Sequence, residues 1–178
     1  REHYNPIIKK IRAIDKPVIA AVNGVAAGAG ANLALACDIV VASQSANLIQ
    51  AFSKIGLIPD SGGTYFLPRL IGLPKATAVM MTGEPVSAEK AEKMGMIYAV
   101  YEDADFESKS LELAKSISAM PTKGLGYTKK LLNHSLNNSL DDQLNLEAET
   151  QALSAKSEDH KEGIQAFLEK RSPIFTGK

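Results

Sequence analysis

The chain has 178 residues, of which 45% are hydrophobic and 22% charged, as expected for one folded domain with or without a smaller appendage. Its 20 basic and 20 acidic residues balance, so charge gives no argument for a nucleic-acid partner or an anionic membrane surface. The single cysteine, Cys37, excludes an internal disulfide, and no apolar run is long enough to span a bilayer. We therefore expect a cytoplasmic protein with no nucleic-acid and no membrane partner.

Hydrophobic periodicity organises the first 43 residues into short elements. Isoleucines at helical spacing predict a helix over 3–14, which ends before Pro17 because the residue before a proline disfavours helix. A buried strand is predicted over 18–22, a tightly packed helix over 31–37 and a second strand over 38–42. Cys37 falls in this helix, where a packing thiol is favoured over a reactive one.

Three glycines, Gly24, Gly28 and Gly30, lie between the first predicted strand and the helix that follows. The first amides of a helix have no internal acceptor and carry a partial positive charge. This turn is therefore suited to an anion or a developing oxyanion near 28–30. The glycine spacing is not that of a dinucleotide fingerprint, G-x-G-x-x-G, so a nucleotide-binding fold is not favoured.

The next sixty residues continue with short elements. An apolar patch at 45–50 and an apolar run at 55–58 come first, and Pro59-Asp60 ends the run. Two short helices, each closed by a glycine, are predicted over 75–82 and 87–94, and a last strand over 96–101.

From Asp103 onward the pattern predicts helices only. Four amphipathic segments follow, over 106–120, 122–136, from 139, and 158–170. Ser139 with Asp142 three residues later resembles a capping box. We therefore expect an α/β region over 1–102 and a helical region over 103–178. The apolar faces of these helices need a partner, either the α/β part or another subunit.

Asp60 is the most informative ionisable residue, and two readings of it stay open. It follows an apolar run and a proline and precedes two glycines, so it is either a functional carboxylate at the edge of a core or a helix N-cap. The segment around it also resembles the nucleophile segment of trypsin-like proteases, but alternating strands and helices do not fit that fold. The three histidines lack metal-ligand spacing, and no metal site is predicted.

Four segments together resemble the crotonase (enoyl-CoA hydratase/isomerase) superfamily, and they occur in the family's order. They are KPVIAAVNGVAAGAGANLALACDIVVAS, FSKIGLIPDSGGTYFLPRLIG, MTGEPVSAEKAEKMGMI and EGIQAFLEKRSPIFTGK. The resemblance implies an α/β fold, a partial spiral of ββα units over 1–102, followed by a helical C-terminal trimerisation region over 103–178. It also implies a homotrimer or a dimer of trimers. Family members have about a third more chain before the first helix, so we expect 1–178 to be a fragment.

The resemblance also assigns roles to site residues. Active members bind an acyl-CoA and hold its thioester oxygen with two backbone amides, one of which falls here on Ala29 after Gly28. Hydratases use two glutamates at positions where this chain has Asn32 and Phe52, and neither side chain can act as an acid or base near neutral pH. Isomerases of the superfamily place one carboxylate where this chain has Asp60. An isomerase with Asp60 as its single acid–base residue is therefore expected.

Further contacts are expected on the same basis. Gly28, Asn32, Leu57 and Phe66 are expected to shape the acyl pocket, although the last three are equally compatible with core positions. Lys170 matches a lysine that reaches coenzyme A in some relatives, and a solvated lysine at a helix end is the alternative. No cofactor is expected, because coenzyme A is part of the substrate.

Within the superfamily, the GVAAGAGA, FSKIGLIPD and KRSP-x-FTGK blocks are most similar to ring-epoxide isomerases of bacterial phenylacetate degradation. These enzymes convert 1,2-epoxyphenylacetyl-CoA into an oxepin-CoA. Three alternatives stay open: a Δ3,Δ2-enoyl-CoA isomerase, a hydratase-family member of other substrate range, and a non-catalytic acyl-CoA-binding scaffold.

Overall fold

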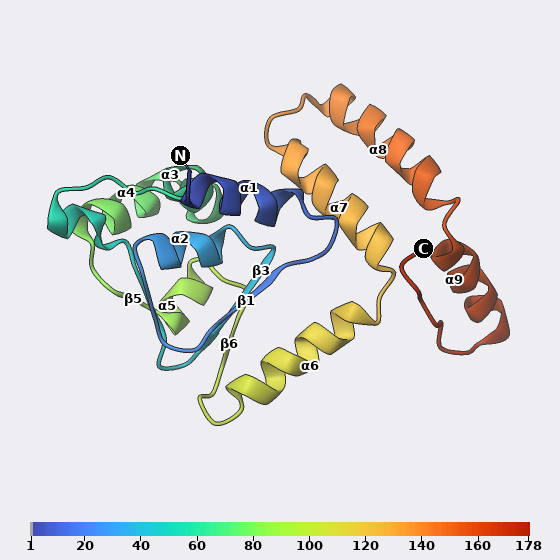
Figure 1. Cartoon of the computed structure of the whole chain (residues 1–178), viewed down its shortest axis with the longest axis horizontal. Helices are drawn as coiled ribbons and strands as arrows, with labels where there is room; N and C mark the ends of the chain where they lie inside the picture. Colours follow the sequence, from blue (N-terminus) through green and yellow to red (C-terminus); the bar gives the residue numbers. More distant parts are fainter. Residues whose placement is uncertain (1) are drawn as a thin grey trace. The chain divides into compact units, whose positions relative to one another are not determined.

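The computed structural model describes residues 2–178 and divides them into two compact units (Figure 1). The first contains the chain up to Arg12 together with Val18–Leu111, and the second contains Ala13–Pro17 and Glu112–Lys178. The domain boundary predicted after residue 102 stays a prediction, and the two units are described separately below.

The first unit contains a parallel sheet in the order β1-β3-β6. Its strands are β1 (Ile19–Val22), β3 (Ile39–Ser43) and β6 (Ala99–Tyr101), with Ile19 opposite Ile39 and Val41 opposite Ala99. The central strand β3 is buried along most of its length. This burial explains why it is a continuous apolar run rather than an alternating one.

A second sheet has the order β2-β4-β5. Strand β2 (Val25–Ala27) pairs in parallel with β4 (Asn47–Ile49), which pairs antiparallel with β5 (Val86–Ser87). The glycine-rich pattern did not predict β2. It has only three residues between Gly24 and Gly28, and Val25 is exposed, so there is no buried run or alternation to detect.

Helices cover these sheets and close the core. They are α1 (Tyr4–Ala13), α2 (Ala29–Leu35), the 3₁₀ helix η1 (Ala51–Ile55), α3 (Gly63–Ile71), α4 (Leu73–Thr82) and α5 (Ala88–Lys93). The core joins α2 and β3 to α3, α4 and α5, and its most deeply buried members include Ala42, Leu67 and Val86. The ends predicted for the two short helices are confirmed by left-handed glycines, Gly83 and Gly95.

The sequence suggested that the apolar run over 55–58 leads to the edge of a core, and this expectation is wrong. Ile55, Leu57 and Ile58 are 72%, 59% and 83% exposed. The run is interrupted by Gly56, which has a left-handed conformation with φ of 71° and ends η1. Its apolar side chains therefore point away from the buried cluster and form an exposed apolar segment directly before Asp60.

Arg12 and Asp38 fix α1 to the end of α2 and the start of β3. Arg12 Nη1 lies 2.9 Å from Asp38 Oδ1 and donates to the Ala36 carbonyl at 3.0 Å. The second carboxylate oxygen accepts from the Val18 N–H at 2.8 Å. Asp38 thus supplies the acceptor for the backbone N–H directly before β1.

The second unit is helical, as predicted for the end of the chain. Helix α6 (Phe106–Ser118) begins in the first unit and continues into the second, followed by α7 (Thr122–Ser135), α8 (Leu140–Ser154) and α9 (Glu158–Glu169). The predicted capping at Ser139 is confirmed, because its Oγ accepts from the Asp142 N–H at 3.2 Å. No helix among residues 2–178 is long and apolar enough to cross a membrane.

Many large apolar side chains of this unit are exposed. They include Met120, Leu132, Leu136, Leu140, Leu144, Leu153, Ile164, Phe167, Leu168 and Ile174. Exposed apolar side chains of this kind are candidates for burial against a partner.

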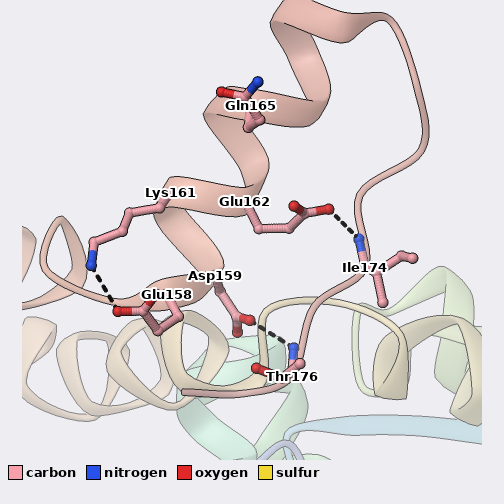
Figure 2. Close-up of a pocket in the computed structure, with 7 residues that line it drawn as sticks. All are labelled: Glu158, Asp159, Lys161, Glu162, Gln165, Ile174 and Thr176. Atoms are coloured by element: carbon pink, nitrogen blue, oxygen red, sulfur yellow. Dashed lines mark hydrogen bonds and ion pairs between the residues drawn. The ribbon is translucent and has the colours of Figure 1, made fainter.

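The C-terminal tail, residues 171–178, folds back on α9 (Figure 2). Asp159 accepts from the Thr176 and Gly177 N–H groups at 2.7 and 2.9 Å, and the Lys178 carbonyl accepts from the Glu158 N–H at 2.9 Å. Glu162 accepts from the Ile174 N–H at 2.8 Å and forms a two-point ion pair with Arg171. Two carboxylates of one helix therefore hold a segment without regular structure.

We expect Glu162→Gln to loosen this tail in a pH-dependent way. Hydrogen bonds from Arg171, and then from the Ile174 N–H, lower the pKa of Glu162 from 4.5 to about 2. A lowered folded-state pKa means that the stabilisation is complete above pH 4.5 and is lost as the pH falls through about 2. Urea unfolding should show the variant to be less stable at neutral pH, with a difference that shrinks below pH 4.5.

Glu158→Gln is the matched control, because among residues 2–178 the Glu158 carboxylate pairs with Lys161 alone, in an exposed contact three residues along the helix, while the backbone N–H that binds the Lys178 carbonyl is unchanged. Such pairs contribute little, so this variant should unfold like the wild type. A difference between Glu162→Gln and wild type that stays constant over this pH range would contradict the assignment.

Candidate active site

Asp60 lies in a loop between η1 and α3 with an exposed side chain. Its Oδ1 accepts a hydrogen bond from the Ser61 hydroxyl at 3.0 Å. The N-cap of α3 is Gly62, and no side chain caps this helix. The N-cap alternative for Asp60 is therefore wrong. Its carboxylate is not used to complete the helix.

Asn32 ties this loop to the glycine turn. Its side chain is fully buried in α2, and Nδ2 donates to the Asp60 carbonyl at 2.9 Å. The Asn32 N–H donates to the Gly28 carbonyl at 3.1 Å. One residue thus connects the backbone of Gly28 with the backbone of Asp60, which brings the two predicted parts of the site together.

Gln50, which the sequence did not single out, completes this connection. It follows β4, is buried, and donates from Nε2 to Asn32 Oδ1 at 2.8 Å. Both ends of the Asn32 amide are thus engaged, and burial strengthens such bonds and the cost of breaking them. The prediction that Asn32 contacts substrate stays a prediction, and the structure places it as a support for the loop.

The Gly28–Ala29 turn has the geometry of a backbone binding site. Gly28 has φ of 53° and ψ of −121°, a conformation open essentially to glycine alone. Its N–H donates to the Ile49 carbonyl at 2.8 Å. Ala29 is the first residue of α2, so helix geometry gives its N–H no acceptor. This amide can donate to a bound oxygen.

Phe52 and Asn32 occupy the two positions where the resemblance places the hydratase glutamates. Phe52 is buried, and its ring lies against Gly28, where an added Cβ would be 3.6 Å from the ring carbon Cζ. An amide and a phenyl ring neither release nor take up a proton near neutral pH, so neither can act as a general acid or base. Asp60 is the carboxylate that this part of the molecule supplies.

The remaining predicted pocket residues are placed in different ways. Phe66 in α3 is half-buried, meets Tyr65 edge-on with ring centroids 5.2 Å apart, and has the Arg12 guanidinium 5.9 Å from its ring centre. Leu57 belongs to the exposed apolar segment before Asp60. Both residues stay predictions as substrate contacts.

Lys170 belongs to the second unit, where it is the exposed C-cap of α9 with φ of 55°. Its neighbour Arg171 pairs with Glu162 and Glu169. The role of Lys170 toward coenzyme A stays a prediction.

Among residues 2–178, no group of three or more potential metal ligands is present. Cys37 is half-buried, and its Sγ donates to the Leu33 carbonyl at 3.4 Å.

Similarity to known proteins identifies the family of this chain. Residues 1–178 match the enoyl-CoA hydratase/isomerase family over their whole length. The chain belongs to this family. This match confirms the predicted family and the crotonase-like α/β fold, and it also confirms the expectation of an enzyme. Members of this enoyl-CoA hydratase/isomerase family act on acyl-CoA thioesters.

Individual family members show how far the similarity extends. A 1,2-epoxyphenylacetyl-CoA isomerase of Escherichia coli is 50% identical over 175 residues, which is 98% of this chain and 67% of that protein. A Rhodobacter capsulatus protein named "Probable enoyl-CoA hydratase" is 47% identical over 100% of this chain and 69% of its own. The crystal structure of an enoyl-CoA hydratase from Polaromonas sp. JS666 has a TM-score of 0.92 at 39% identity, covering 97% of this chain and 67% of that one.

Proposed function

We propose that this enzyme isomerises 1,2-epoxyphenylacetyl-CoA to an oxepin-CoA, with Asp60 as its single acid–base residue. The observation that carries the proposal is a set of three side chains: the Asp60 carboxylate, whose Oδ1 is bound by Ser61 and whose Oδ2 has no hydrogen-bond partner among residues 2–178, and an amide and a phenyl ring at Asn32 and Phe52. The 50% identity to an isomerase of this substrate supports the choice of reaction.

The mechanism divides the work between two parts of the site. The Ala29 N–H polarises the thioester carbonyl and lowers the cost of forming an enolate. Asp60 removes a proton alpha to that carbonyl, or returns one further along the molecule. The carbon–carbon bond shared by the epoxide and the six-membered ring breaks as the ring electrons shift, and the oxygen, with both its C–O bonds kept, becomes part of the seven-membered oxepin. The proton and the electron pair stay within one substrate molecule, so no redox cofactor or metal is required.

The exposed apolar side chains of the second unit support a proposal about subunit contacts. We propose that its apolar surface packs between subunits in a homotrimer or dimer of trimers, since so many large apolar residues are uncovered in one chain. Lys170 is proposed to contact the coenzyme A portion of the substrate.

A substrate comparison with the full-length protein tests the proposal. The ring epoxide, a trans-3-enoyl-CoA and a trans-2-enoyl-CoA would be incubated separately and the products separated by chromatography with mass detection. Conversion of the epoxide to an isomer of equal mass, faster than any other reaction, is expected. Faster shift of the trans-3 double bond would favour a Δ3,Δ2-enoyl-CoA isomerase, and gain of water by the trans-2 substrate would contradict the one-carboxylate mechanism. Coenzyme A thioester binding without turnover would indicate a scaffold.

A further inference from the structure

Ser61, the residue directly after the proposed base, has an unusual backbone. Its φ is 51°, and among residues 2–178 only one other non-glycine residue, Lys170, has a positive φ. Side chains with a Cβ disfavour this left-handed region, and glycine adopts it without that cost. Gly62 and Gly63 follow immediately, so a serine stands in a segment where glycine would be easier to accommodate.

The Ser61 side chain is turned toward Asp60. It is only 3% exposed, and its Oγ donates to Asp60 Oδ1 at 3.0 Å, whereas no residue among 2–178 hydrogen-bonds to Oδ2. The hydroxyl therefore fixes one carboxylate oxygen and leaves the other available.

The backbone below this contact is also held. The Asp60 carbonyl accepts from Asn32 Nδ2 at 2.9 Å and from the Gly63 N–H at 2.8 Å. With its carbonyl fixed from two sides, the remaining freedom of Asp60 is rotation of its side chain. The Ser61 hydroxyl is the described contact that restricts this rotation.

We propose that Ser61 is a positioning residue, which holds the Asp60 carboxylate in one rotamer with Oδ2 presented to the substrate. The left-handed conformation of Ser61 is what turns its Oγ back onto the preceding side chain, and strained backbone of this kind is typical of functional sites. The inference rests on the proposed role of Asp60 as the base.

The test compares Ser61→Gly with wild type in the full-length protein. Glycine relieves the left-handed backbone, so the melting temperature should not fall, but it removes the hydroxyl. We expect kcat to fall about tenfold, because a misplaced catalytic group loses rate, while KM changes little. Ser61→Ala should lose activity similarly but keep the unfavourable backbone. Ser108→Ala, which removes an exposed hydroxyl bound to the Asp105 carbonyl, is the control and should match wild type.

A double variant separates this inference from the proposed function. In an Asp60→Asn background, Ser61→Gly should cause no further loss, because there is no base left to orient. Full activity of Ser61→Gly beside an inactive Asp60→Asn would overturn the role of Ser61 and leave the base assignment intact. A lower melting temperature with an unchanged kcat would also overturn it. An active Asp60→Asn enzyme would overturn both.

Discussion

Asp60→Asn should lower kcat for the ring-epoxide isomerisation by about 100-fold or more, since general acid–base catalysis contributes about 10²–10⁴-fold. The fold should survive this change. The contacts that hold the loop, from Asn32 and Gly63, go to the Asp60 backbone carbonyl, and the asparagine side chain keeps an oxygen that can accept from Ser61. Steady-state kinetics with the epoxide, together with a thermal melt, measure both expectations.

Asp105→Asn is the matched control for this experiment. Asp105 is an exposed aspartate of the same unit and pairs with Lys109 four residues later at 3.2 Å. Its loss should leave the rate unchanged, because exposed pairs contribute little. If the Asp60 variant retained a rate within about threefold of wild type, well short of the effect of losing a general base, Asp60 would not be the base.

Gly63→Ala should destabilise the protein by about 1–3 kcal/mol, the usual cost of overpacking a filled site. An added Cβ would lie 2.7 Å from both Cγ and Oδ1 of Asn32, and still closer to Nδ2. The amide cannot move aside cheaply, because it is buried and bound to Gln50 and to the Asp60 carbonyl. Urea unfolding would measure the loss, and a parallel fall in kcat would follow from displacement of the Asp60 loop.

Gly30→Ala provides the comparison. This glycine is also in the first turn of a helix, but nothing lies within 4 Å of an added Cβ, so the change should be neutral or stabilise by up to about 1 kcal/mol. In an Asn32→Ala background, Gly63→Ala should cost less than in wild type, since the obstructing amide is gone. Equal costs in both backgrounds would show that Asn32 is not the obstacle.

Elements whose apolar spacing repeats over several helical turns could be predicted from the sequence. The helices of the second unit follow helical apolar spacing, and the Ser139 cap follows from side-chain chemistry three residues apart. Strand β2 could not be predicted, because three residues between glycines carry no periodicity. The exposure of Leu57 and Ile58 was also missed, since an apolar run looks the same whether it is buried or uncovered.

The site shows the same division between local and long-range information. Local patterns single out the glycine turn at 28–30 and Asp60, whereas the roles of Ala29 and Asp60 come from the family resemblance. The bond from Gln50 to Asn32 joins residues 18 positions apart, and that from Asn32 to Asp60 spans 28. Neither bond follows from local chemistry. The left-handed backbone of Ser61 is equally hidden, because serine gives no such signal, whereas a glycine would have.

The buried Asn32 amide has a consequence for how the two chemistries of this family can evolve into one another. A glutamate at position 32 would supply one carboxylate at a hydratase position, but it would offer no N–H to the Asp60 carbonyl, and it is larger than the asparagine that already lies against Gly63. It would also place a charge where there is no exposed surface. A single Asn32→Glu substitution would therefore break the hydrogen bond that ties α2 to the Asp60 loop.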